Sequence, residues 1–140
     1  MSSTTATTAT EIRNALATAI SDAIPLNAQP YLQSSLNPPC AVVLRGPITY
    51  DEAMDGGVHF WTFLVRVYVA SVSDIGAQMN LDDYLAAEGD LSLKAALEVD
   101  TSLGGIVSAV HVTEATGEQE LVREQGGPLL FSEWTVEVWL

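Results

Sequence analysis

Residues 58–71 alternate as a β-strand does, but they carry apolar side chains on both faces of that strand. A run of this length spans roughly 45 Å when extended, whereas a compact domain of this chain length is only about 37 Å across. We therefore expect the strand to bend or to reach past its own domain. Helices of one small chain can cover one face of a sheet, and antiparallel sheets usually leave the other face polar. The pattern thus predicts that a second copy of the chain covers the second face, which carries Phe60, Leu64 and Tyr68.

The N-terminal part of the chain predicts one long amphipathic helix. Thr8 and Glu11 stand at the spacing of a capping box, and Pro25 ends the helical pattern. Between them one apolar stripe follows the helical period through Ile12, Ala15, Leu16, Ala19, Ile20, Ala23 and Ile24. Because this stripe is wide and continuous, we expect the helix to pack flat on a sheet. Residues 1–10 are expected to form a flexible arm, and residues 11–140 a single domain.

The rest of the chain predicts strands and two shorter helices. The expected strands are residues 40–48, 58–71, 106–116 and 129–140, and the prolines in 27–39 favour irregular structure there. One helix is expected from Ser73 or Asp74 to about Ala87, and a shorter one begins at Ser92 and ends before Gly104. The order of these elements predicts an α+β domain. Its sheet is mostly antiparallel or mixed, with about four long strands and helices on one side.

Two segments near the C-terminus are candidate contacts between subunits. The polar loop over residues 117–127 is long enough to form a protruding arm or an extended hairpin, and insertions of this kind are often functional. It supplies Glu120, Leu121 and Arg123 as candidates. In the last strand, Trp139 lies on the opposite face from Trp134, Val136 and Val138. The full set of subunit-interface candidates is therefore Phe60, Leu64, Tyr68, Trp139, Glu120, Leu121 and Arg123.

Composition narrows the classes of function. The chain has 140 residues, of which 48% are hydrophobic, and its formal net charge is −13. The high apolar content argues against disorder. The acidic excess argues against tight binding to nucleic acid or to an anionic membrane surface, because both depend on Lys and Arg. The N-terminus has no signal-peptide pattern, and no apolar stretch is long enough to span a membrane. A lone Cys40 leaves no internal disulfide and no multi-cysteine metal site.

Motifs for chemistry are weak throughout the chain. There is no nucleophile elbow, P-loop or dinucleotide fingerprint, and His59 and His111 have no further ligand at metal-binding spacing. Asp82 and Asp83 point about 100° apart on a helix, so they do not converge on one ion. The acidic residues of 51–55 lack the alternating spacing of a calcium loop. We therefore expect no catalytic, cofactor-binding or metal-binding residues.

The whole pattern resembles the tail terminator proteins of long-tailed bacteriophages, especially those that infect actinobacteria. The likeness covers about residues 11–140. It is carried by IRNALATAISDAI, PPCAVVLRGPITYD, FWTFLVRVYVAS, AQMNLDDYLA and GDLSLKAALEVDTSLGG, followed by the two closing strands. The resemblance implies a structural virion protein of the tail or neck, assembled in the host cytoplasm. Such a protein forms a homo-hexameric ring on the tail tube, stops tube polymerisation and joins the tail to the head connector. DNA passes through its channel without specific binding.

Three alternatives stay open at this stage. The chain could be another ring component, such as a tube protein or a head-closure adaptor. It could be a cofactor-free enzyme on a dimeric α+β barrel that uses His59 or His111 as a base. It could also be a small binding domain in which Phe60, Leu64 and Tyr68 form a groove. For the ring, the acidic charge predicts a channel wall of carboxylates, and a lumen lined by Arg45, Arg66 or Arg123 would contradict this.

Overall fold

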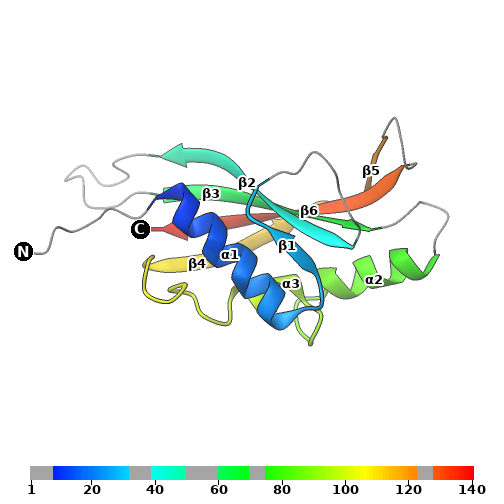
Figure 1. Cartoon of the computed structure of the whole chain (residues 1–140), viewed down its shortest axis with the longest axis horizontal. Helices are drawn as coiled ribbons and strands as arrows, with labels where there is room; N and C mark the ends of the chain where they lie inside the picture. The colour runs from blue at the N-terminus through cyan, green and yellow to red at the C-terminus, as the bar shows by residue number, and fades with distance from the viewer. Residues whose placement is uncertain (1–7, 32–38, 50–59, 70–74, 123–127) are drawn as a thin grey trace, which may run out of the picture.

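The computed structural model describes residues 8–31, 39–49, 60–69, 75–122 and 128–140, and it shows an α+β fold with a mixed sheet (Figure 1). The elements, in chain order, are α1 (Ala9–Ala23), β1 (Asn27–Gln29), β2 (Cys40–Thr49), β3 (Phe60–Val69), α2 (Ile75–Leu85), α3 (Leu93–Leu97), β4 (Ala109–Ala115), β5 (Gln119–Leu121) and β6 (Leu129–Trp139). Helix α1 begins inside the range expected to be an arm, and the rest of that arm, residues 1–7, lies outside the described residues.

The sheet has six strands, in the order β1-β2-β3-β6-β4, with β5 also paired to β6. The four long strands are those that the sequence predicts, whereas β1 and β5 correct the expectation of about four. Strand β1 lies in a segment expected to be irregular and pairs parallel to β2, while the other pairings are antiparallel. Both added strands have three residues, which is too short for an alternating pattern to appear in the sequence.

The centre of the sheet is the antiparallel pair of β3 and β6, which runs from Phe60 opposite Trp139 to Val69 opposite Leu130. The ends of the expected strand, residues 58–59 and 70–71, lie outside the described residues. On the other side of β3, the register of β2 shifts between Arg45 and Ile48. There a Cβ on Gly46 would stand 3.1 Å from the Thr62 carbonyl oxygen, so only glycine fits without a shift. The irregularity in the pairing of β2 with β3 therefore falls at Gly46 and Pro47.

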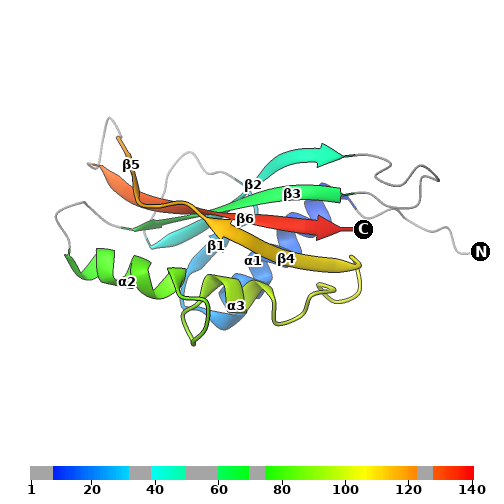
Figure 2. The same cartoon turned by 180° about the vertical axis from the view of Figure 1, so that it is seen from behind.

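All three helices cover the same face of the sheet, as the two opposite views show (Figures 1 and 2). Helix α1 starts where Thr8 accepts a hydrogen bond from the Glu11 amide at 3.3 Å. Its stripe of Ile12, Leu16 and Ile20 is fully buried. The same core contains Trp134, Val136 and Val138 of β6, as the alternation of that strand predicts. Among the described residues, no helix is long and apolar enough to cross a membrane.

The opposite face, which we call the outer face, holds a second and smaller core. It consists of Cys40, Val42, Tyr68, Leu129 and Phe131, with Leu44 and Leu121 packed beside it. The rings of Tyr68 and Phe131 lie 5.2 Å apart. The expectation that Tyr68 needs a second chain for its cover is therefore wrong, because its side chain is 1% exposed within one chain. Its neighbours on β2 and β6 and the approach of β5 bury this end of the outer face.

Candidate functional site

The outer face divides into a buried half and a half that stays partly exposed. We define the open patch as the partly exposed residues of β2, β3 and β6 on this face, namely Leu44, Thr62, Leu64, Thr135, Glu137 and Trp139. Pairing across the strands aligns Leu44 with Leu64 and Leu64 with Thr135, so these side chains are neighbours on one surface. Leu44, Leu64 and Trp139 are the apolar side chains of this mixed patch, and because one chain leaves them partly exposed, the patch is a candidate contact surface.

The predicted interface residues lie in different parts of the structure. Leu64 and Trp139 belong to the open patch, while Tyr68 belongs to the second core. In β5, Glu120 is exposed, and Leu121 is partly buried against the second core. Arg123 and the side chain of Phe60 lie outside the described residues. For the loop over residues 117–127, the sequence predicts a protruding arm or an extended hairpin. Its described part contains β5, which pairs antiparallel with the following strand β6, as the hairpin alternative predicts.

A charged pair separates the two halves of the outer face. Arg66 Nε donates to Glu133 Oε2 at 2.6 Å, and the guanidinium lies 4.9 Å from the centre of the Phe131 ring. Burial lowers the pKa of Arg66, but its contacts with Tyr68 and Glu133 outweigh this, and the net pKa is raised. The charge of Arg66 is therefore matched inside the chain, and it does not form a free cationic site for a polyanion.

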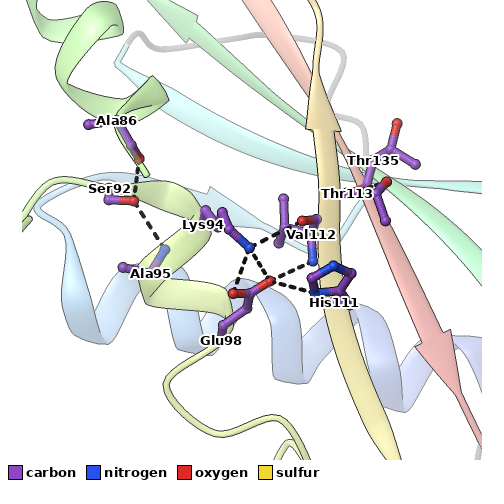
Figure 3. Close-up of polar contacts among 9 residues, drawn as sticks. All are labelled: Ala86, Ser92, Lys94, Ala95, Glu98, His111, Val112, Thr113 and Thr135. Carbon is purple, nitrogen blue, oxygen red and sulfur yellow. Dashed lines mark hydrogen bonds and ion pairs between the residues drawn. The ribbon is translucent and has the colours of Figure 1, made fainter. Parts of the chain in front are cut away.

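A second polar cluster joins α3 to the outermost strand β4 (Figure 3). Glu98 Oε2 accepts from Lys94 Nζ at 2.7 Å and from the Val112 amide at 2.8 Å, and it lies 3.2 Å from His111 Nδ1. Lys94 Nζ also donates to the Val112 carbonyl at 3.3 Å. Burial raises the pKa of Glu98. The hydrogen bonds from Lys94 and Val112, together with the charges of Lys94 and His111, outweigh burial and leave that pKa below its usual value.

Sequence reasoning missed this cluster, because it found no carboxylate near His111. Residues 98 and 111 meet only when α3 packs beside β4, so no spacing motif signals the contact. The His111 side chain is 61% exposed, which places it on the surface. His59 lies outside the described residues. Within the described part of the chain, no group of three or more His, Cys, Asp or Glu side chains could hold a metal ion.

A groove of about 560 Å³ lies between α1 and the segment that follows α3. Its described lining is mostly alanine, valine and leucine, with Asp22 and Asp100 as its carboxylates. The Asp100 carboxylate accepts hydrogen bonds from the Ser102 hydroxyl and from the amides of Gly104 and Ser102, and these bonds hold its pKa below the usual value. Asp100 therefore stabilises its own turn. The described lining contains no histidine, cysteine or lysine that would serve as a base or a nucleophile.

Comparison with protein-family models gave no match to this chain, and comparison with curated proteins gave none. The function is therefore proposed from the geometry of the described residues and from the resemblance of the sequence pattern to tail terminator proteins.

Proposed function

We propose that this protein is a bacteriophage tail terminator. In this role it forms a homo-hexameric ring that caps the tail tube, stops its polymerisation and joins the tail to the head connector in the virion. The single observation that carries the proposal from the structure is the open patch, where Leu64 and Trp139 stay partly exposed beside a fully built helix-side core. In a closed ring every copy covers its neighbour through one repeated contact. The resemblance of the sequence pattern to tail terminator proteins supports the same function.

The distribution of charge supports the passage of DNA without tight binding. The net charge is −13. Arg66 and Lys94 are paired with Glu133 and Glu98, and Arg13 donates to the backbone carbonyls of Pro30 and Val43. Basic side chains whose charge is matched by a carboxylate, as in Arg66 and Lys94, release few counterions from DNA, and such release drives most non-specific binding.

One alternative of the same class is a different ring component of the tail or neck. The position of the ring in the particle distinguishes this alternative from a tail terminator. The alternative of an enzyme gains no support from His111. Its side chain is exposed and lies beside Glu98, and it does not line the groove between α1 and the segment that follows α3.

The proposal is tested by adding the purified chain to purified tail tubes. Light scattering gives the number of copies, and electron microscopy shows where they sit. We expect six-fold rings at one end of the tube and an arrest of tube growth. A chain that stays a single copy and leaves the tube ends bare would overturn the proposal.

A pair of variants locates the contact surface. Leu64→Glu places a charge in the open patch, and we expect it to abolish ring formation while the circular dichroism spectrum is unchanged. Met79→Glu makes the matched change on α2, where the side chain is 62% exposed on the helix side. We expect this control to form rings as the parent chain does. Rings that form equally well with Leu64→Glu would show that the open patch is not the contact.

A further inference from the structure

We propose that Lys94 and Glu98 guard the outer edge of β4 by occupying backbone groups to which a strand from a second copy would otherwise pair. Strand β4 ends the sheet and pairs only with β6 among the described strands. A bare edge of this kind presents a row of unpaired N–H and C=O groups and is a template for edge-to-edge association. The proposal concerns the isolated chain, so it is independent of the ring function.

We call the pair of Lys94 and Glu98 the guard, and it binds both backbone polar groups of Val112. In an antiparallel strand, the N–H and the C=O of a residue point to the same side. The Val112 N–H donates to Glu98 Oε2 at 2.8 Å, and the Val112 C=O accepts from Lys94 Nζ at 3.3 Å. One residue of an incoming strand would make these same two bonds. The two side chains thus substitute for a strand at the middle of β4, as Figure 3 shows.

Neighbouring contacts hold the guard in place. Lys94 and Glu98 stand one helical turn apart, and Lys94 Nζ contacts both carboxylate oxygens, at 2.8 and 2.7 Å. His111 Nδ1 approaches the same carboxylate from β4. At the start of α3, Ser92 accepts from the Ala95 amide and donates to the Ala86 carbonyl, so the helix is anchored at the end before the guard. An ordinary surface ion pair needs none of these backbone contacts.

Different features protect the opposite edge of the sheet from pairing with another strand. Strand β1 pairs with the first residues of β2, and Arg13 donates to the Val43 carbonyl at 3.1 Å just beyond that pairing. Pro47, which has no N–H, and the bulge beside it follow further along β2. Bulges and prolines are devices that stop sheets from joining at their edges. Both long edges of the sheet thus carry features that oppose edge-to-edge pairing in the isolated chain.

The test is the substitution Glu98→Ala in the full chain, with Glu98→Gln beside it. Alanine removes the acceptor for the Val112 amide, whereas glutamine keeps a carbonyl oxygen there. For Glu98→Ala we expect hydrogen exchange of the Val112 amide to accelerate roughly tenfold, which matches the loss of a hydrogen bond to a charged acceptor. We also expect concentration-dependent association with an infrared signal of intermolecular β-sheet. Glu98→Gln should show much less of both effects.

Two further variants keep the result decisive. Glu88→Ala removes the same charge from an exposed position between α2 and α3 and should behave as the parent chain does. If Glu98→Ala does not fold, Lys94→Met carries the test, since it removes the donor to the Val112 carbonyl together with the ion pair to Glu98, and keeps both the aliphatic stem and the Glu98 acceptor for the Val112 amide. The proposal is overturned if the Val112 amide exchanges faster and the chain associates no more than the parent does. It is equally overturned if association occurs without new β-sheet.

Discussion

The two faces of the sheet share a similar apolar alternation, but a single chain buries one face far more fully than the other. The helix-side face is closed by α1, α2 and α3, and Phe63, Trp134 and Val136 are buried there. On the outer face only the end around Tyr68 and Phe131 is buried, and Leu64 stays partly exposed. The difference shows that apolar residues on a second face do not by themselves demand a second chain. Part of that face is filled by cross-strand neighbours, and only the remainder is available for contacts.

The largest expected effect comes from the helix-side face. Trp134→Ala removes a side chain that is 2% exposed at the centre of the main core. We expect the free energy of unfolding to fall by about 3–5 kcal/mol, because large-to-small changes leave a cavity that the core fills only partly. Urea unfolding followed by circular dichroism measures this. A loss below about 1 kcal/mol, typical of surface positions, would mean that the core is not packed as described.

A smaller effect is expected on the buried half of the outer face. Phe131→Leu keeps an apolar side chain but removes the ring that contacts Tyr68 and the Arg66 guanidinium. We expect a loss of about 1–2 kcal/mol, since each ring contact adds roughly 1 kcal/mol beyond burial. The double variant with Arg66→Met isolates the contribution of the cation. In Arg66→Met the cost of Phe131→Leu should shrink, and an unchanged cost would contradict the contact.

The pH dependence of stability tests the edge of β4, which neither face covers. The pKa of Glu98 is lower in the folded chain than its ordinary value of 4.5. The charged carboxylate therefore stabilises the fold above pH 4.5, and this contribution is lost as the pH falls from there through the lower folded pKa. Glu98→Gln should differ from the parent chain in stability at pH 7 and converge toward it at low pH. A constant difference across this range would show that the charge of Glu98 is not involved.

The smallest effect on stability is expected in the open patch. Leu64→Thr replaces a partly exposed side chain by one that suits a strand, so we expect the free energy of unfolding to change by less than about 1 kcal/mol. Self-association measured by sedimentation should nevertheless weaken, because the apolar contact is gone. If stability falls as far as in Trp134→Ala, Leu64 belongs to a core of the single chain and the contrast between the two halves of the outer face is lost.

Several features of this protein were determined by the sequence alone. The cap at Thr8, the break at Pro25 and the start of α3 at Ser92 follow from local chemistry, which acts over a few residues. The long strands and the shared face of Trp134 and Val136 follow from alternation. These signals sufficed for the α+β architecture with helices on one side.

The tertiary structure alone decided which distant residues meet. Arg66 and Glu133 are 67 positions apart and pair only because β3 and β6 are adjacent in a fixed register. Glu98 reaches Val112 only because α3 packs beside β4, and Tyr68 is buried only because three strands bring its neighbours together. A local pattern sets the periodicity of a segment, but the pairing of strands is chosen by the free energy of the whole core. For that reason the faces of each element could be derived in advance, while the guard and the second core could not.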